Sequence, residues 1–274
     1  MIYICTALYC EAQPFIVHLN LKKELESYQF QIFKNKETVL IITGIGKVKA
    51  AVAVTYLLLR YPVSNRDILI NVGVCGAQDR DFLVGTVYLC NKIIDRDTKK
   101  YYFPDMLLKH PFEENSIETC SFVVEEDEVD IEGKLVDMEA AGIYQAASMF
   151  LQTHQLFFLK IISDHLCIKA LTAEKIISLV GDQVETILNW VNEIIPAFSC
   201  DKNVISKEEE KILKKVSEAI KLTAAMEVQL KQLLIYYKLQ HGDFTNVVSR
   251  YIGIECKSKN EGKKYFEELR KKLI

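Results

Sequence analysis

Short apolar runs alternate with amphipathic segments along residues 1–196, and this alternation restricts the fold more than any other feature of the chain. Runs rich in β-branched and aromatic residues predict strands. They lie at 1–8, 30–34, 38–43, 67–73, 85–94 and 157–163, with 121–124 as a further candidate. Helical periodicity marks 47–60, 138–152 and 173–195, the last ending at Pro196. Strands that alternate with helices predict an α/β fold with helices on both faces of the sheet.

The charge balance changes near residues 198–203. Residues 1–200 hold 18 basic and 26 acidic side chains, a net charge of −8, whereas residues 201–274 hold 16 and 11, a net charge of +5. Such an asymmetry indicates a change of module. We therefore predict one domain at 1–198 and an α-helical appendage of unknown role at 202–274.

The appendage carries an apolar seam with alternating spacings of four and three residues. The seam consists of Ile212, Val216, Ala219, Thr223, Met226, Leu230, Leu233 and Tyr237. It predicts a helix that packs within its own domain or on a second short helix, with a dimerising coiled coil as the alternative. Further helices are predicted at 242–254 and 261–273. Lysines at 257, 259, 263 and 264 leave open a helix-turn-helix that binds nucleic acid, against a default of solvated helix faces.

Composition narrows the class of protein. Half of the residues are hydrophobic, enough for a sizeable core, and the net charge of −3 argues against a whole-chain binder of polyanions. The eight cysteines form no C-x-x-C pair and several lie in apolar runs, which predicts reduced thiols. With no basic-then-apolar leader and no apolar run near ~18 residues, we expect a cytoplasmic protein that does not bind a membrane.

Three carboxylates stand where an α/β sheet places ligands. Glu11 and Asp164 each follow a predicted strand, and Glu139 opens an apolar helical run. Taken singly, Glu11 is typical of a helix N-terminus and Asp164 of an N-cap. Together, carboxyl groups with separated pKa values can hydrolyse a glycosidic bond, one activating water and one assisting the leaving group. Glu139 can accept hydrogen bonds from two adjacent hydroxyls, as on a ribose, and Met138 offers the sugar a polarizable surface.

The glycine loop at 43–48 resembles a phosphate-binding loop only loosely. It lacks the spacing of G-x-x-x-x-G-K-[ST] and of G-x-G-x-x-G, which excludes a nucleoside triphosphate or dinucleotide site. Its two glycines permit a tight turn from strand to helix. The five histidines have no metal-ligand spacing, so no metal site is predicted.

Five segments, in this order, resemble the purine nucleoside phosphorylase and nucleosidase superfamily, and within it the methylthioadenosine/S-adenosylhomocysteine nucleosidases. They are 7–11, 43–51, 71–76, 136–140 and 162–164, of which Gly-Ile-Gly-Lys-Val and Asp-Met-Glu-Ala are the more specific. The resemblance covers about residues 1–196. It implies a three-layer α/β/α sandwich around a mixed, partly barrel-like central sheet, with no metal or organic cofactor and a homodimer.

The resemblance also implies a role for each matching residue. Glu11 matches the general base that activates the attacking water, and Asp164 matches the acid at N7 of the leaving purine. Ser163 would orient that acid. Glu139 matches the residue that holds the ribose hydroxyls, and Met138 the one that packs on the sugar. Carboxylates near the ribose would stabilise an oxocarbenium-like transition state.

Hydrolysis is favoured over phosphorolysis by the groups around Gly73. Phosphorylases of the superfamily surround phosphate with arginines and a serine, which suit a dianion. Here no arginine precedes Gly73, and Val74 stands where a serine is usual. Glu11 would repel phosphate but suit water. Lys160 stands where the nucleosidases carry an arginine near the nucleophilic water, and it lacks the planar fork of that residue. The resemblance thus implies that Gly73, Val74 and Lys160 contact the substrate, together with Met138, Glu139 and Ser163.

These observations predict an N-ribosyl hydrolase that acts on a purine nucleoside or a 5′-substituted adenosine. Two alternatives stay open: a phosphate-dependent phosphorylase, and a degenerate nucleoside-binding protein whose helical tail engages a partner. The short segment between Tyr102 and Val136 favours the second, because an acidic run at 125–128 stands where a base-binding loop is expected.

Overall fold

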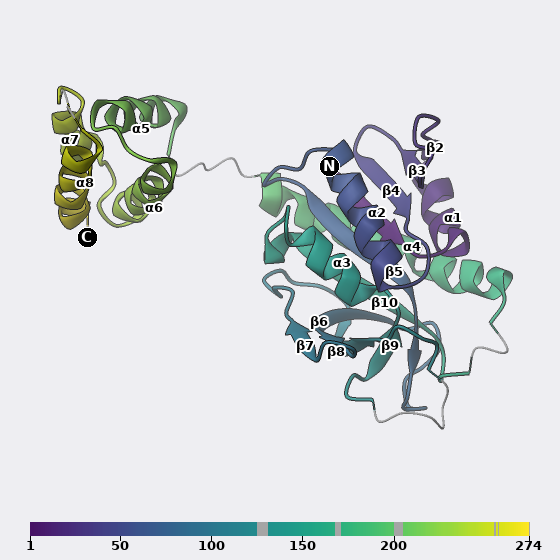
Figure 1. Cartoon of the computed structure of the whole chain (residues 1–274). Coiled ribbons are helices and arrows are strands. Elements are labelled where there is room, and N and C mark those ends of the chain that lie inside the picture. The colour runs from purple at the N-terminus through teal and green to yellow at the C-terminus, as the bar shows by residue number, and fades with distance from the viewer. Residues whose placement is uncertain (125–130, 168–170, 200–204, 255, 257, 274) are drawn as a thin grey trace. The chain divides into compact units, whose positions relative to one another are not determined.

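In the computed structural model, the apolar runs of residues 2–164 form one mixed sheet of ten strands (Figure 1). The strands are β1 (Ile2–Thr6), β2 (Lys22–Lys23), β3 (Gln31–Lys34), β4 (Thr38–Ile42), β5 (Ile68–Ala77), β6 (Val87–Asp95), β7 (Lys100–Tyr102), β8 (Glu113–Thr119), β9 (Leu135–Asp137) and β10 (Leu156–Asp164). The structure describes residues 1–124, 131–167, 171–199, 205–254, 256 and 258–273. Two units are distinguished, Met1–Ser199 and Cys200–Ile274, and the sheet belongs to the first.

Part of the sheet closes into a ring. β10 pairs in parallel with β5 and antiparallel with β6. β6 continues through β8 and β9 back to β5, which completes the ring. β1 and β4 extend the sheet in parallel from β5, and β3 and β2 follow antiparallel. The sheet is therefore mixed and partly barrel-like, as the resemblance implies.

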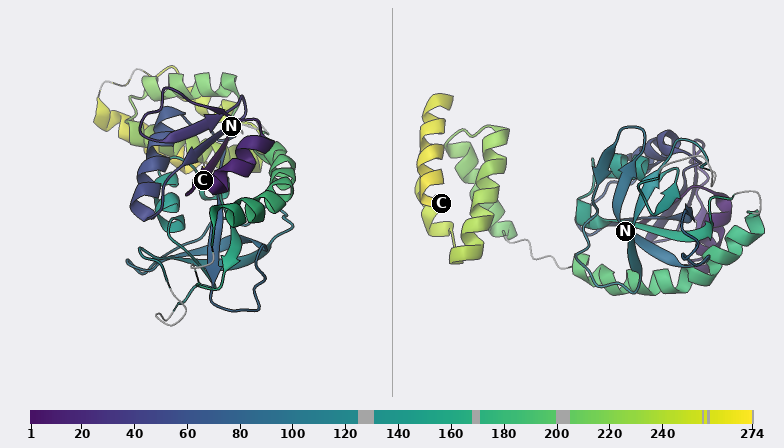
Figure 2. Two further views of the ribbon diagram at one scale, coloured as in Figure 1. Left: turned by 90° about the vertical axis from the view of Figure 1, so that its right-hand side faces the viewer. Right: turned by 90° about the horizontal axis from the view of Figure 1, so that it is seen from below.

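Helices cover both faces of this sheet. They are α1 (Tyr9–His18), α2 (Lys47–Arg60), α3 (Ala140–Ala147), the short η1 (Thr153–Gln155) and α4 (Ala173–Ser199). α2 and α3 contact each other and share one core with the sheet, and α1 and α4 do the same in a second core. Figure 2 shows the long α4 curving along one side of the sheet. The predicted three-layer α/β/α sandwich is confirmed.

Several predicted strands need correction. β5 does not end at Gly73 but continues through Gly76 to Ala77, because this part pairs with β10 and β9. The prediction of a strand at 121–124 is wrong: the chain bends there, and the strand is the preceding β8. β8 escaped prediction because its exposed first half is polar and Ile117 is its only apolar residue.

Two predicted helices also need correction. α4 does not stop at Pro196, which is exposed three residues before the helix ends. A proline there removes one late hydrogen bond of the helix, and Ile194 and Phe198 still pack on the core on either side. The helix predicted at 138–152 is shorter, spanning 140–147. Its first residues instead form the N-terminal turn that begins at Glu139.

The second unit contains α5 (Lys207–Ala219), α6 (Ala224–His241), the short α7 (Thr245–Val248), η3 (Ser249–Tyr251) and α8 (Lys259–Leu273). A capping box begins α5, in which the Ser206 hydroxyl accepts from the Glu209 amide and the Glu209 carboxylate accepts from the Ser206 amide. Thr223 begins α6 in a similar way by accepting from the Met226 amide. The Lys238 ammonium bonds the Glu209 carboxylate at 2.6 Å, which ties α6 to α5.

The predicted apolar seam is divided between α5 and α6. Val216 and Leu230 are fully buried in one core, with Met226 and Leu233 packed against it. The prediction that the seam packs within its own domain is thereby confirmed. Further helices are present near 242–254 and 261–273. Lys257 and the side chain of Lys259 lie outside the described residues, so the nucleic-acid alternative stays a prediction.

Candidate active site

The second half of β5 brings the predicted site residues together. Gly73 pairs with Lys160 of β10, and Val74 pairs with Ile161. Gly76 pairs with Asp164 on one side and with Val136, three residues before Glu139, on the other. The carboxyl ends of β5 and β10 and the end of β9 thus meet at one place. This is where an α/β sheet commonly binds its ligands.

Glu11 lies in the first turn of α1 and is 2% exposed. One carboxylate oxygen accepts hydrogen bonds from the Ala7 and Leu8 amides, both at 2.8 Å, and the other accepts from the Val74 amide at 2.9 Å. Burial raises the pKa of Glu11, and the amide donors and the Lys160 ammonium oppose that shift. The backbone therefore fixes the carboxylate in one orientation.

Gly73 makes room for this carboxylate. A Cβ atom at position 73 would lie 2.8 Å from Oε1 of Glu11, so any other residue here would displace the carboxylate. Val74 is partly buried and uses its amide, not its side chain, to hold Glu11. Both residues had been predicted to contact substrate. The structure places them against Glu11, so their contribution is to shape and hold the carboxylate.

Glu139 begins α3 and is 7% exposed. Its carboxylate accepts a hydrogen bond from the Gly46 amide at 2.8 Å, across 93 residues of sequence. Gly46 has a φ of +103°, a conformation that favours glycine, and this aims its amide at the carboxylate. Burial, with the negative charge of Asp137, raises the pKa of Glu139 to about 7. The predicted glycine loop thus holds a carboxylate. Met138 beside it is partly buried.

Asp137, which we did not predict as a site residue, holds the base of the site. Its carboxylate accepts from the Lys160 ammonium at 2.7 Å, the Ala140 amide at 2.8 Å and the Thr119 hydroxyl at 2.7 Å. Lys160 is 1% exposed. Its neighbours Asp137 and Glu139 raise its pKa against the opposing effect of burial. The signal in the sequence was available, because a buried strand that contains a lysine requires a buried acid as partner.

Asp164 and Ser163 end β10. The Ser163 hydroxyl lies 2.6 Å from Oδ2 of Asp164 and 3.1 Å from the Cys75 carbonyl, while Oδ1 of Asp164 accepts from the Cys167 amide at 2.9 Å. Since a serine has one hydroxyl proton, it donates to one of these two acceptors at a time. Ser163 can therefore donate to an ionised Asp164, or accept from a protonated one while it donates to Cys75.

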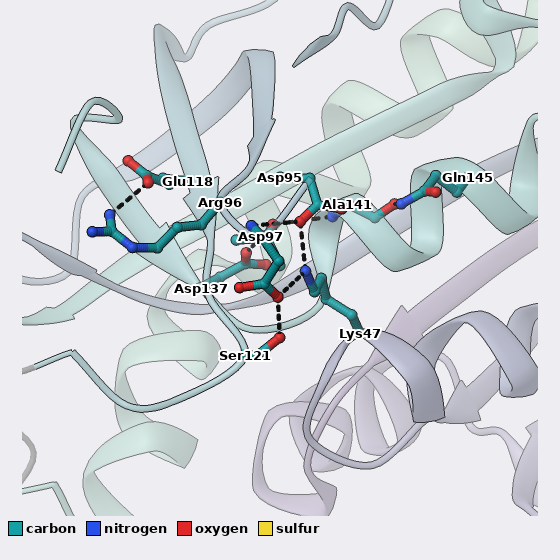
Figure 3. A network of polar contacts seen from close by, with 10 residues as sticks. Lys47, Asp95, Arg96, Asp97, Glu118, Ser121, Asp137, Ala141 and Gln145 are labelled. Atoms are coloured by element: carbon teal, nitrogen blue, oxygen red, sulfur yellow. Dashed lines mark hydrogen bonds and ion pairs between the residues drawn. The ribbon is translucent and has the colours of Figure 1, made fainter. Parts of the chain in front are cut away.

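A second polar network adjoins the glycine loop (Figure 3). The Lys47 ammonium bonds both Asp95 and Asp97 at 2.5 Å, and the Ser121 hydroxyl donates to Asp97. Asp95 is 2% exposed. Asp95 is the last residue of β6, and Asp97 follows it in the turn to β7. Through Lys47 and Ser121, these two carboxylates connect the start of α2 to the segment after β8. The acidic run at 125–128, which follows that segment, lies outside the described residues.

The described residues contain no group of three or more His, Cys, Asp or Glu side chains placed to hold a metal ion. Seven cysteines are free in the part of the chain that the structure describes. The arrangement instead offers three acids, Glu11, Asp137 and Glu139, around one buried ammonium, and burial raises the pKa of the two glutamates. Such a set can move protons and stabilise a developing positive charge.

Comparisons with known proteins agree with this architecture. A family model described as the phosphorylase superfamily matches residues 6–130. A 5′-methylthioadenosine/S-adenosylhomocysteine nucleosidase of Staphylococcus carnosus is 30% identical over 108 residues, which span 37% of this chain and 45% of the relative. The chain thus matches less than half the length of that curated relative.

Solved structures cover more of the chain. The corresponding nucleosidase from S. pneumoniae, bound to a transition-state inhibitor, matches with a TM-score of 0.57 and 24% identity, over 69% of this chain and 97% of that one. A futalosine hydrolase of Helicobacter pylori matches with a TM-score of 0.56 and 16% identity, over 70% and 97%. Likeness at this identity shows a common fold. The family match covers slightly less than half of the chain, and over that part the chain is similar to the phosphorylase superfamily.

Proposed function

We propose that the first unit is a nucleosidase that hydrolyses the N-glycosidic bond of a purine nucleoside or a 5′-substituted adenosine, such as methylthioadenosine or S-adenosylhomocysteine. The observation that carries this proposal is the meeting of Glu11, Glu139 and Asp164 around residues 73–76 of β5. The matches to nucleosidases support the choice of reaction.

Glu11 would activate the attacking water. A carboxylate has about four lone-pair positions, and three of those on Glu11 already accept backbone amides. One position is left for a water proton. Since burial raises the pKa of this carboxylate, Glu11 accepts a proton more readily than an exposed glutamate would. Water oxygen then bonds to C1′ as its proton passes to Glu11.

Asp164 would assist the leaving base. As the C1′–N9 bond breaks, its electron pair moves to the purine, and a proton from Asp164 reaches N7. When Asp164 loses its proton, the Ser163 hydroxyl can turn from the Cys75 carbonyl to donate to the ionised carboxylate, because both acceptors lie within hydrogen-bond distance. Glu139 would accept hydrogen bonds from the ribose hydroxyls, with Met138 packed on the sugar. In its ionised form it would also stabilise the positive charge that develops on the ring.

Water suits this site better than phosphate as the nucleophile. Among the described residues, Lys160 is the only buried basic side chain, and Asp137 already accepts from its ammonium. A phosphate dianion would have to approach Glu11 without an arginine fork to receive it. We therefore favour hydrolysis over phosphorolysis.

A homodimer is proposed on the basis of the outer face of α2. Val48, Val52 and Leu59 are 77%, 55% and 66% exposed, and Ile45, just before the helix, is 48% exposed. These positions share one side of the helix. An exposed apolar stripe of this kind is typical of a surface that a partner covers. Sedimentation of Val48→Glu against wild type would test it, with a shift to monomer expected.

Release of free base from methylthioadenosine, S-adenosylhomocysteine, adenosine and inosine, measured with and without phosphate, tests the proposed reaction. We expect release of one base without phosphate, together with a free 5-substituted ribose. Release that requires phosphate, with a ribose 1-phosphate visible by phosphorus NMR, would establish the phosphorylase instead. A thermal shift with a nucleoside but no release would indicate a binding protein.

A further inference from the structure

A buried ion pair lies beneath the two glutamates of the site. The Lys160 ammonium and the Asp137 carboxylate are 2.7 Å apart, and their side chains are 1% and 0% exposed. Lys160 pairs with Gly73 in the sheet, and Glu11 lies over Gly73. Asp137 is two residues from Glu139. The pair is thus adjacent to both carboxylates without occupying the position of either.

Asp137 fixes the start of α3. Its Oδ2 accepts from the Ala140 amide, and its Oδ1 accepts from the Thr119 hydroxyl, whose oxygen accepts in turn from the Ala141 amide at 3.0 Å. These bonds satisfy two of the free amides at the helix N-terminus. Glu139 stands between Asp137 and these amides. Its backbone is therefore held from both sides.

Charged groups from three elements act on Glu139. Asp137 of β9 and Glu11 of α1 raise the pKa of Glu139, whereas Lys160 of β10 and the Gly46 amide lower it. Cys75 of β5 and Cys90 of β6 also lie near Lys160, but burial raises the pKa of both thiols, so they are neutral. Three acids and one base share this buried space, so the single positive charge decides how readily the acids ionise.

We propose that the Lys160–Asp137 ion pair is a positioning element of the site, in which Asp137 orients Glu139 and Lys160 supplies the charge that allows Glu139 and Glu11 to ionise. Neither residue is assigned contact with the substrate; both act through the glutamates. The relevance to catalysis rests on the proposed nucleosidase function, whereas the effect on Glu139 is a property of the free protein.

Two substitutions of the pair have opposite expected effects. Lys160→Met leaves three acids without a base, so the pKa of Glu139 should rise by about 1 unit or more. Asp137→Asn keeps an oxygen that accepts from the Ala140 amide but removes the negative charge that is paired with Lys160. The Lys160 ammonium then acts on Glu139 and Glu11 alone, so the pKa of Glu139 should fall. The double variant Asp137→Asn/Lys160→Met removes one negative and one positive charge, so the pKa of Glu139 should return to near its wild-type value.

The measurement is a carbon-13 NMR titration of side-chain carboxyls in the ligand-free full chain, with the Glu139 signal assigned by Glu139→Gln. Lys160→Arg should retain the wild-type titration, and Lys92→Met, which breaks an exposed pair with Glu132, is the matched control. If Lys160→Met does not fold, Asp137→Asn and Lys160→Arg still test the proposal. In parallel, the acid limb of kcat/KM should move to higher pH in Lys160→Met and to lower pH in Asp137→Asn.

Opposite shifts of the Glu139 titration in folded single variants, cancelled in the double variant, would support the proposal. A Glu139 titration that is unchanged in both folded single variants would overturn it. If the shifts occur but the wild-type chain releases no base from any nucleoside, the ion pair still controls Glu139 and the proposed nucleosidase function fails.

Discussion

The two units of the chain differ in the polar side chains that they bury. The first unit buries six acids among its described residues, Glu11, Asp67, Asp95, Glu118, Asp137 and Glu139, together with Lys160. Among the described residues of the second unit, the buried side chains are apolar except for the Ser217 hydroxyl and one free thiol, Cys256. Burial of a charge is costly unless the charge is paired, so a chain retains it mainly where it serves chemistry.

The buried acids indicate a candidate reactive site in the first unit, whereas the second unit is a helical module with an apolar core. In the first unit, burial raises the pKa of Glu11, and burial together with the negative charge of Asp137 raises the pKa of Glu139. Strongly shifted carboxyl groups of this kind are typical of active sites. Among the described residues of the second unit, no charged side chain is buried. The excess of five positive charges in residues 201–274 can therefore act on partners.

Asp164→Asn should have the largest effect, and it should be confined to activity. Loss of the proposed general acid should lower kcat by about 10²–10⁴-fold. Stability should change little, because Asp164 is partly exposed and an asparagine oxygen can still accept from the Cys167 amide. Base release and thermal unfolding are the two measurements. Asp182→Asn on the exposed side of α4 is the control, and an equal loss in both variants would contradict the assignment.

Lys47→Met compares the two units directly. It leaves the buried Asp95 without its ammonium partner, and breaking a buried pair should destabilise the first unit by about 3 kcal/mol. Lys231→Met in α6 breaks an exposed pair with Glu210 and should cost less than about 1 kcal/mol. Chemical denaturation of both variants gives the values. Similar small costs would show that the Lys47 network does not stabilise the unit.

Glu139→Gln should weaken activity and yet stabilise the fold at neutral pH. The pKa of Glu139 rises from an ordinary 4.5 to about 7, so the folded state binds the extra proton between these values. Stability from this group is present near pH 4.5 and is lost as the pH rises toward 7. A glutamine stays neutral and keeps an oxygen for the Gly46 amide.

The unfolding temperature of wild type should therefore fall more steeply between pH 5 and pH 8 than that of Glu139→Gln. At pH 8 the variant should be more stable by about 1–3 kcal/mol. Parallel curves for the two proteins would show that Glu139 titrates as an ordinary glutamate.

Ser217→Ala should give the smallest effect, a stabilisation of the second unit by about 1 kcal/mol. The hydroxyl is buried and has no hydrogen-bond partner among the residues that the structure describes, and alanine also favours a helix over serine. Hydrogen exchange of the α5 amides should slow, while exchange in β5 stays unchanged. Faster exchange in α5 would indicate that the hydroxyl has a partner of its own.

Much of the fold could be predicted from the sequence, because periodicity reports which residues are buried. The bounds of α2 were predicted correctly from its apolar spacing. β8 was missed because its polar residues are ordered by pairing with β6 and β9, which no local pattern reveals. Pro196 misled the prediction of α4 because long-range packing outweighed a local helix breaker.

The candidate site, like the fold, could be predicted from the sequence only in part. The order of segments pointed to Glu11, Glu139 and Asp164, and the structure brings the three to β5. The partners that set their pKa values were not predictable from spacing. Asp137 lies 23 residues from Lys160 and Gly46 lies 93 residues from Glu139, so these contacts exist only once the sheet has formed.

Base release by residues 1–199 alone tests the central claim that the chemistry belongs to the first unit. The purified fragment should fold, since its cores contain no residue beyond Phe198. It should release base from methylthioadenosine or a related nucleoside without phosphate, at a rate close to that of the full chain, since Glu11, Glu139 and Asp164 all lie in the first unit. A folded fragment without activity, beside an active full chain, would contradict this account.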